Sequence, residues 1–251
     1  SDVAGGLETT ATREGDTWSI TGHKRWIGNA AMSDVILVVA KDAADGRARA
    51  FLVPREAPGV TLTDIGGKIS LRMVRNADII LDDVRVPESD RLQRIESFRD
   101  ISAILAKLRY VIGWNAAGLQ AGAYEAALAY ALRREQFGRP IAGFQLIQEK
   151  LTRMLGNATA TLAMAVRLTE LAQRGPLGDE YAALTKTWAA DRARETVALG
   201  REICGAEGIR VDNDVARYFA DCEALYTFEG THEINSLIVG RAITGLSAFT
   251  R

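Results

Sequence analysis

Asp100–Ile112, with the sequence DISAILAKLRYVI, is the stretch that decides the fold class of this chain. Its apolar residues recur at helical spacing, at Ile101, Ile104, Leu105, Leu108, Val111 and Ile112. This period places them on one face of an amphipathic helix. We expect the helix to run on to about Arg133, through an Ala- and Gly-rich segment at residues 116–122 that lets another backbone approach closely.

Glycine and proline divide the rest of the C-terminal part into further helices. The breaks fall at residues 137–140 (FGRP), 175–178 (GPLG) and 205–208 (GAEG). We therefore expect helices over residues 144–174, 179–204, 214–225 and 231–243. Long helices with short connections predict an antiparallel four-helix-bundle domain, which we place at residues 93–251.

Residues 1–92 have the pattern of a small antiparallel β-barrel or sandwich domain, so the predicted class is α+β with two domains. Strand-like runs over residues 7–13 and 17–21 are joined at Glu14-Gly15-Asp16, which is a hairpin pattern. Residues 34–40 form a nearly continuous apolar run, which predicts a strand buried on both faces. Further strands are expected over residues 50–54, 60–65 and 77–81.

The composition of the chain argues against nucleic-acid binding, a zinc site and a membrane span. The chain has 31 Lys and Arg residues against 32 Asp and Glu residues, so no nucleic-acid partner is expected. The two cysteines lack metal-ligand spacing, and the two histidines leave little material for a zinc site. We expect no signal peptide. The sequence contains no run of about 20 apolar residues, so no membrane span is expected either. We expect a cytoplasmic protein, or one of the mitochondrial or peroxisomal matrix in a eukaryote.

Two short segments are candidates for a reactive site. Tyr226–Thr231, YTFEGT, places Glu229 between an aromatic residue and a glycine, just before a helix. Taken alone, such an acid is most often an exposed residue at a helix start. Residues 133–140, RREQFGRP, followed by Phe144-Gln145, place arginine beside a turn and a new helix. There Arg134 could meet a phosphate or simply cap a helix end.

Together these segments resemble the middle and C-terminal domains of the acyl-CoA dehydrogenase family. Arg134–Gly138 with Gln145 resembles the family's R-x-Q-F-G…Q motif, and Tyr226–Thr231 resembles its YEGT catalytic turn. Lys24–Asn29, KRWIGN, resembles the K-x-W-I-T-N segment beside the flavin, and residues 240–249 resemble the glutaryl-CoA dehydrogenase branch. The family's N-terminal helical domain has no counterpart here. Because Ser1-Asp2 resembles the end of the family's T-E-P-x-x-G-S-D segment, we expect further residues to precede this chain.

The resemblance implies an FAD-dependent acyl-CoA dehydrogenase acting on a short-chain or dicarboxylic, glutaryl-like acyl-CoA. Glu229 would remove the α proton while a hydride passes to flavin N5. Burial would raise the pKa of Glu229, whereas the helix that begins near Thr231 would lower it. The implied substrate contacts are Ser1, Arg109 and Gly230. The implied cofactor contacts are Ser1, Trp26, Ile27, Gly28, Arg134, Phe137, Gln145, Glu202, Gly205, Ala206, Thr231 and Phe249.

The resemblance also implies partners and leaves alternatives. An electron-transfer flavoprotein would accept the electrons, and Arg134 and Gln145 match residues that reach the FAD of a neighbouring subunit in a homodimer or homotetramer. Gly28 stands where many family members have a Thr or Ser that contacts the flavin. A short-chain acyl-CoA oxidase branch resembles this chain in having glycine there, so O2 is an alternative electron acceptor. Glu202 replaces a Gln, and its carboxylate would repel phosphates, while Ala206 replaces a Gly. A non-catalytic fragment or assembly partner is the third possibility, because the N-terminal domain is missing.

Overall fold

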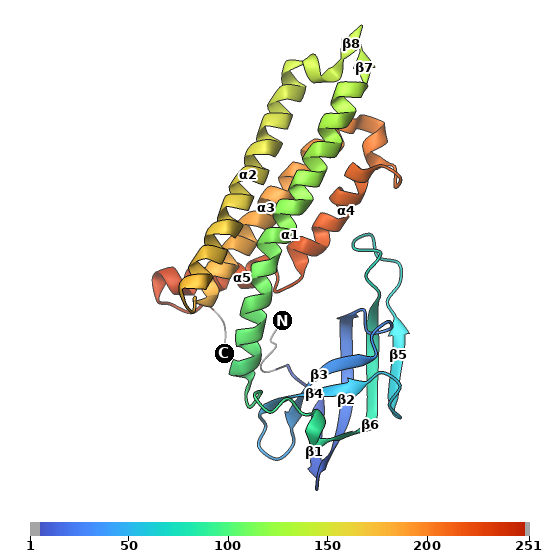
Figure 1. Ribbon diagram of the computed structural model, residues 1–251, viewed down its shortest axis with the longest axis vertical. Coiled ribbons are helices and arrows are strands. Elements are labelled where there is room, and N and C mark those ends of the chain that lie inside the picture. The colour runs from blue at the N-terminus through green and yellow to red at the C-terminus, as the bar shows by residue number, and fades with distance from the viewer. Residues whose placement is uncertain (1–5, 249–251) are drawn as a thin grey trace. The chain divides into compact units, whose positions relative to one another are not determined.

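The computed structural model describes residues 6–248. Its contacts divide the chain into a β unit, Ser1–Ile104, and a helical unit, Leu105–Arg251 (Figure 1). Each unit has its own hydrophobic core. The predicted α+β class, with strands followed by helices, is confirmed. None of the helices in the described residues is both long and apolar enough to cross a membrane.

The β unit is one bent sheet in the order β4-β3-β1-β2-β6-β5. Its strands are β1 (Thr10–Glu14), β2 (Thr17–Gly28), β3 (Val35–Asp42), β4 (Ala48–Pro54), β5 (Val60–Asp64) and β6 (Asn76–Pro87). All neighbours pair antiparallel except β1 and β3, which are parallel. Because β4 and β5 are edge strands, the described sheet is not a closed barrel.

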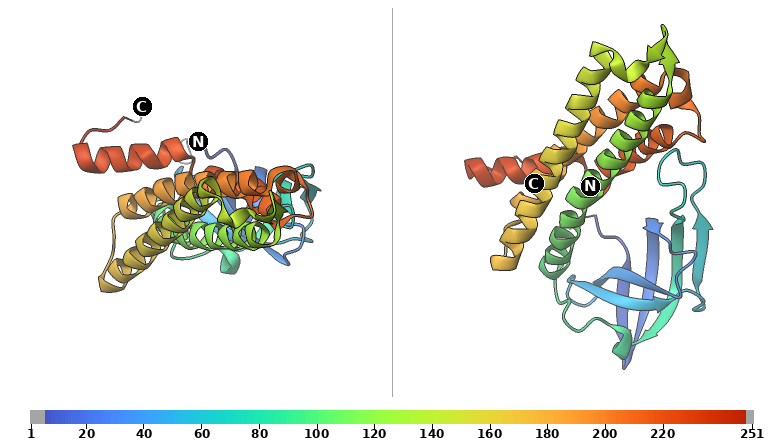
Figure 2. Two further views of the ribbon diagram at one scale, coloured as in Figure 1. Left: turned by 90° about the horizontal axis from the view of Figure 1, so that it is seen from above. Right: turned by 45° about the horizontal axis from the view of Figure 1, so that its top comes forward.

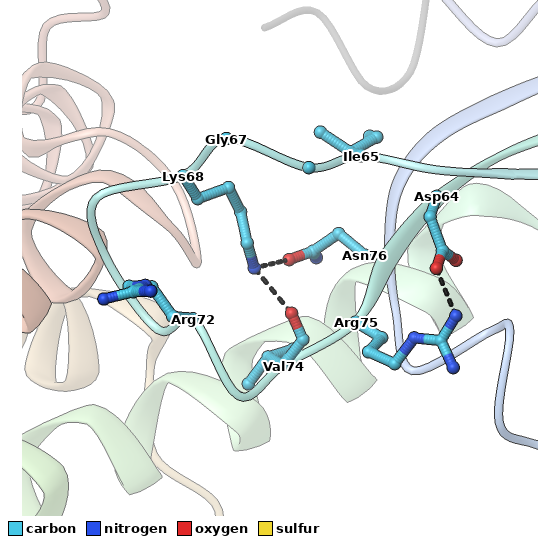
Figure 3. A pocket seen from close by; sticks show the side chains of 9 residues that line it. Asp64, Ile65, Gly67, Lys68, Arg72, Val74, Arg75 and Asn76 are labelled. Carbon is cyan, nitrogen blue, oxygen red and sulfur yellow. Dashed lines mark hydrogen bonds and ion pairs between the residues drawn. The ribbon is translucent and has the colours of Figure 1, made fainter.

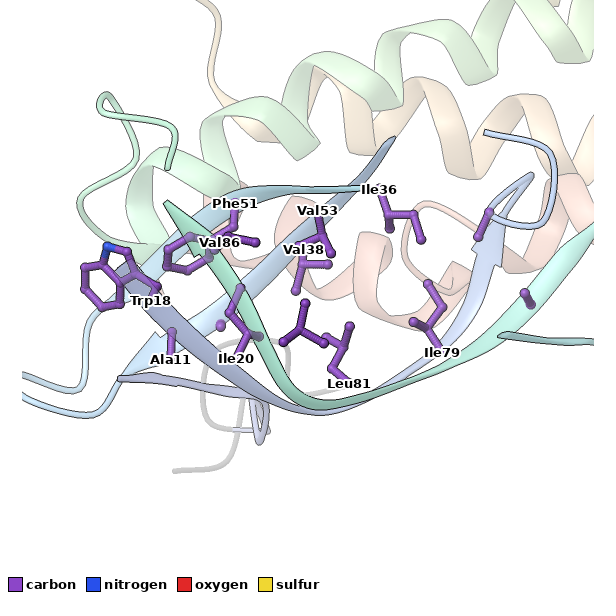
Figure 4. Packing of buried hydrophobic residues seen from close by; sticks show 14 residues of the cluster. Ala11, Trp18, Ile20, Ile36, Val38, Phe51, Val53, Ile79, Leu81 and Val86 are labelled. Atoms are coloured by element: carbon purple, nitrogen blue, oxygen red, sulfur yellow. The ribbon is translucent and has the colours of Figure 1, made fainter. Parts of the chain in front are cut away.

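The core of the β unit lies in the concave face of this sheet (Figure 4). Trp18 and Phe51 pack there with ring centroids 5.3 Å apart, and the Trp18 indole donates a hydrogen bond of 2.5 Å to Glu88. The prediction that residues 34–40 are buried on both faces was wrong. Ile36 and Val38 are buried, but Leu37 on the opposite face is 53% exposed. The strand alternates because only one face of the sheet packs against this core.

Strand β2 runs seven residues beyond the predicted end at Thr21, to Gly28. Its second half is polar and lacks the alternation that marks a half-buried strand, so sequence pattern did not reveal it. Two register shifts against β6, at Ile20/Gly22 and at Lys24/Ile27, interrupt the pairing. The second shift contains Trp26 in the left-handed region, with φ of 63°. Such a conformation is strained for an aromatic residue and is held by the surrounding bulge.

The helical unit contains the five predicted helices, with ends within a few residues of those expected. They are α1 (Phe98–Arg133), α2 (Gln145–Arg174), α3 (Asp179–Cys204), α4 (Asp214–Thr227) and α5 (His232–Thr244). A small hairpin of β7 (Glu135–Gln136) and β8 (Arg139–Pro140) joins α1 to α2. The helix α5 packs against α3 and projects beyond the bundle formed by α1–α4 (Figure 2).

Two helix ends in the helical unit are set by a capping residue and a glycine, and one glycine of α1 lies close to a neighbouring helix. Thr231 accepts a hydrogen bond from Ile234 N at 3.3 Å and so caps the start of α5, and Gly205, with φ of 55°, ends α3. At Gly122 the close neighbour of α1 is a side chain, not the backbone that the sequence predicted. A Cβ atom there would lie 2.4 Å from the hydroxyl oxygen of Tyr218 on α4.

Candidate active site

The turn between α4 and α5 presents the carboxyl group of Glu229. Glu229 has φ of 55° and Gly230 has φ of 85°, so two consecutive residues are left-handed. Glycine adopts this conformation without steric cost, but glutamate does not. The strain at Glu229 therefore requires that other groups hold the turn.

Three side chains from other segments hold the carbonyl groups of this turn. Arg109 Nε on α1 donates to Glu229 O at 3.1 Å. Asn235, fully buried on α5, donates to Gly230 O at 2.9 Å and to Thr231 O at 3.0 Å. Lys186 Nζ on α3 donates to Tyr226 O at 2.8 Å and to Gly230 O at 2.7 Å. The turn is thus fixed through its backbone, and no side chain of the described residues forms a hydrogen bond or ion pair with the Glu229 carboxyl group.

Sequence reasoning missed Lys186 and Asn235. Lys186 stands among buried alanines of α3, and Asn235 occupies the inner face of α5. A polar residue where the helical period requires an apolar one is the pattern that could have revealed them.

The half-buried environment raises the pKa of Glu229 above its ordinary value of 4.5. Burial disfavours the charged carboxylate and is the largest cause. The cations of Arg109 and Lys186 oppose it without overcoming it. From the sequence we expected burial to raise the pKa of Glu229 and the start of α5 to lower it. Burial has the larger effect.

Arg109 is already engaged by this part of the helical unit. Its guanidinium pairs with Asp179 at the start of α3, and its side chain is 12% exposed. A Cβ atom on Gly230 would lie 3.9 Å from Arg109 Nε, so the two predicted substrate contacts do lie together. Their contact with substrate itself stays a prediction.

A second group of predicted residues gathers at a pocket of about 340 Å³ at the far end of α1 and α3. Its lining includes Arg134, Gly205 and Ala206, with Gln136 and Glu207. Within the described residues, the Arg134 guanidinium makes no hydrogen bond or ion pair, so it is available to an anionic group. An unpaired guanidinium beside a pocket fits a phosphate-bearing cofactor.

Glu202 and Ala206 differ from the Gln and Gly of the motif that they resemble, and the structure tolerates both differences. Glu202 accepts a hydrogen bond of 2.5 Å from Lys150, which lowers the pKa of the carboxyl group and compensates its charge. Glu202 is not among the residues that line the pocket. Ala206 is not left-handed, unlike Gly205, so alanine in place of glycine brings no backbone strain.

Two other residues of the motif that contains Arg134 are exposed: Phe137 at the tip of the hairpin and Gln145 at the start of α2. Phe137 has φ of 51° and is 94% exposed, and its ring meets Phe144 edge-on with centroids 6.0 Å apart. Gln145 is the exposed first residue of α2, whose N-cap residue Phe144 supplies no side-chain hydrogen bond. Both predicted cofactor contacts are therefore open to a partner.

In the β unit, Trp26, Ile27 and Gly28 end strand β2. The indole of Trp26 is 55% exposed, Ile27 packs against the edge of the core, and Gly28 pairs with Asn76. The bulge before Ile27 interrupts the strand pairing at Trp26, whose exposed indole is accessible for stacking on a ligand. Ser1 and Phe249 lie outside the described residues.

In a pocket of about 200 Å³ in the β unit, lined by residues 64–68, 72 and 74–76, the ammonium group of Lys68 is already engaged by the loop itself (Figure 3). Lys68 Nζ there donates to Leu71 O, Val74 O and Asn76 Oδ1 at 3.1, 2.6 and 2.5 Å. Arg75 is paired with Asp64. Lys68 therefore organises the loop between β5 and β6.

Two family models match the sequence. The model for the acyl-CoA dehydrogenase C-terminal domain matches residues 98–244, and the model for the middle domain matches residues 1–84. A probable acyl-CoA dehydrogenase of Bacillus subtilis is 33% identical over 245 residues, covering 96% of this chain and 64% of the relative. The chain thus spans less than two thirds of that relative's length.

Solved structures agree with these matches. A crystal structure of glutaryl-CoA dehydrogenase from Mycobacterium smegmatis is 39% identical, with a TM-score of 0.92. A second structure of a glutaryl-CoA dehydrogenase from this organism, in complex with FADH2, is 33% identical with a TM-score of 0.93. Each likeness covers 98% of this chain and 63% of the solved chain.

Proposed function

Because this chain belongs to the acyl-CoA dehydrogenase family, we propose that it supplies the base and part of the FAD site of an enzyme that desaturates acyl-CoA thioesters. The observation that carries this proposal is the turn at Glu229. A half-buried carboxyl group with a raised pKa is held on a strained backbone by Arg109, Lys186 and Asn235. A carboxylate of raised pKa is a better base near neutral pH.

In the proposed reaction, Glu229 accepts the α proton of the thioester on a carboxylate oxygen. The electron pair of the broken Cα–H bond forms the new Cα=Cβ bond as a hydride leaves the β carbon. Bound FAD supplies the hydride acceptor at flavin N5. Arg109 and Lys186 are fixed cations near the carboxyl group, and they favour its ionised form in opposition to the larger effect of burial.

We propose FAD contacts in the β unit and, separately, in the helical unit. Trp26, Ile27 and Gly28 would meet the flavin, and Arg134 with the Gly205–Ala206 turn would meet its phosphates or adenine. The exposed indole of Trp26 supports this assignment, as does the Arg134 guanidinium, which is unpaired among the described residues. The likeness to a structure in complex with FADH2 also supports it.

We propose a second copy of the chain as the partner that completes the site, in a homodimer or homotetramer. Support comes from the exposure of Phe137 and Gln145 beside Arg134, where the motif resembles residues that reach a neighbouring FAD. Light scattering of the FAD-loaded protein tests this directly. A monomer that turns over substrate at the full rate would refute it.

For the substrate we propose a short-chain or dicarboxylic acyl-CoA of the glutaryl type. Residues 240–249 resemble that branch, and both solved relatives named above are glutaryl-CoA dehydrogenases. A panel of acyl-CoA thioesters of increasing length, together with glutaryl-CoA, tests the proposal. A kcat/KM that rises steadily toward long chains would contradict it.

An electron-transfer flavoprotein is the proposed acceptor, and O2 is the second candidate. The observation that favours O2 is Gly28, which offers the flavin no hydroxyl group. A Cβ atom there would lie 3.9 Å from Val74, so the backbone would accept a larger residue. Peroxide formed on adding acyl-CoA in air identifies an oxidase, whereas turnover that requires an added acceptor identifies a dehydrogenase.

Substitution of the base tests the proposed function. In the protein that carries this chain, Glu229→Gln should lower kcat by at least about a hundredfold, while the flavin spectrum is retained. The matched control is Glu170→Gln on the exposed face of α2, which should keep normal turnover. Near-normal turnover by Glu229→Gln would refute the assignment. A colourless wild-type protein that cannot be reconstituted with FAD would instead support a non-catalytic fragment or assembly partner.

A further inference from the structure

Lys186 is a cation in the centre of the helical unit. It lies midway along α3 and its relative exposure is 0%. Lysine is almost never fully buried unless it is paired, because removing its charge from water is costly. The residues described here nevertheless include no carboxylate within ion-pair distance of Lys186 Nζ. Since no direct counter-ion offsets the cost of burying this charge, other interactions of the ammonium group must compensate for it.

Those interactions are the hydrogen bonds that the ammonium group donates to two carbonyl oxygens. Tyr226 O belongs to the last turn of α4, and Gly230 O precedes the first residue of α5. The ammonium group therefore links the two ends of the turn that contains Glu229. Arg109 and Asn235 hold carbonyl groups within the turn, but among the described residues neither donates a hydrogen bond to Tyr226 O.

Charges from several elements surround this ammonium group. Glu229 in the turn, Glu233 on α5 and Asp191 on α3 favour its charged form, and Arg109 on α1 disfavours it. Burial has the largest effect and lowers the pKa of Lys186 to about 8. The group is therefore protonated at neutral pH and acts on the Glu229 carboxylate as a cation.

We propose that Lys186 is a positioning residue for Glu229, which holds the turn that presents the carboxyl group by joining the carbonyl oxygens at both of its ends. The inference rests on the proposed role of Glu229 as the base. Lys186 acts through the turn and touches no reacting atom. Its loss should therefore affect the rate of proton abstraction more than substrate binding.

The test compares Lys186→Met and Lys186→Arg with the matched control Lys107→Met in the FAD-loaded protein. Methionine retains the volume of lysine but has neither charge nor donors, and Lys107 is an exposed lysine on α1. We expect Lys186→Met to lower kcat by about tenfold or more with KM changed by less than about threefold. The acid limb of the kcat profile should move up by about one pH unit, because a cation near Glu229 is lost. Lys186→Arg should restore most of kcat, and Lys107→Met should equal wild type.

A second measurement does not depend on turnover. Isotope-edited infrared spectra, with Glu229→Gln as the reference, report the titration of the Glu229 carboxyl group in wild type and in Lys186→Met. A carboxyl pKa that rises supports the positioning role even if Glu229 proves not to be the base, in which case Glu229→Gln keeps its turnover. An unchanged titration together with a wild-type kcat overturns the inference. If Lys186→Met does not fold, Lys186→Gln replaces it, with the same two criteria.

Discussion

Gly230→Ala is the substitution that most directly tests how the Glu229 turn is held. Gly230 has φ of 85°, and a Cβ atom there would lie 2.9 Å from Asn235 Nδ2. Asn235 is fully buried and makes hydrogen bonds to Gly230 O at 2.9 Å and Thr231 O at 3.0 Å. The new methyl group therefore meets both an unfavourable backbone conformation and a neighbour that is fixed in place.

The expected destabilisation has two contributions. A non-glycine residue in the left-handed region costs about 1 kcal/mol. Displacing the Asn235 amide weakens at least one buried hydrogen bond, which adds about 1–2 kcal/mol. The unfolding free energy of Gly230→Ala should thus fall by about 2–3 kcal/mol. Because Glu229 O is held by the same groups, kcat should fall by about tenfold or more, which corresponds to about 1.4 kcal/mol in the barrier.

Two other glycines separate these contributions. Gly245, with φ of 73° at the end of α5, has no atom within 4 Å of the position of a Cβ atom. Gly245→Ala should therefore show the conformational cost alone, about 1 kcal/mol, with normal kcat. Gly240 lies inside α5, also with open space, so Gly240→Ala should stabilise by about 0.5–1 kcal/mol.

The assay is a urea titration of each variant, followed by circular dichroism at the helical band, with kcat measured in parallel. The expected order of stability is Gly240→Ala above wild type, then Gly245→Ala, then Gly230→Ala. If Gly230→Ala is no less stable than Gly245→Ala and retains its kcat, then Asn235 does not hold the turn as described.

The remaining predictions concern the charge of Glu229 and the role of Arg134. The folded pKa of Glu229 is raised, so the fold loses stability as the pH rises from the ordinary value of 4.5 through that raised pKa, and the loss is absent below 4.5. Glu229→Gln should therefore be more stable than wild type at pH 7, with a difference that vanishes near pH 3–4 in thermal unfolding. Arg134→Ala should weaken FAD binding roughly 10- to 100-fold in equilibrium titrations, because a charged hydrogen bond contributes about 1.5–3 kcal/mol. Arg167→Ala, which breaks only an exposed ion pair with Glu170, should bind FAD normally.

The helical unit could be predicted well because its rules act locally. The period of apolar residues identified each helix, and glycine or proline marked each break, as at Gly175 and Gly205. The β unit was predicted less completely. The second half of β2 carries polar residues and a bulge, and its pairing with β6 depends on residues about 50 positions away. Exposure of Leu37 likewise depends on which face of the sheet meets the core, which strand pattern alone does not specify.

The site shows a further limit of sequence reasoning. Glu229 and Arg134 were found because short motifs include their side chains, whereas Lys186 and Asn235 act on backbone carbonyl oxygens. Every residue has such an oxygen, so no residue type in the turn identifies the acceptor, and no pair of side chains indicates the contact. What the sequence does contain is the donor, a polar residue on a helix face that must otherwise be apolar. Because an unpaired buried donor is costly, such a residue indicates that a strained or functional backbone segment lies against that face.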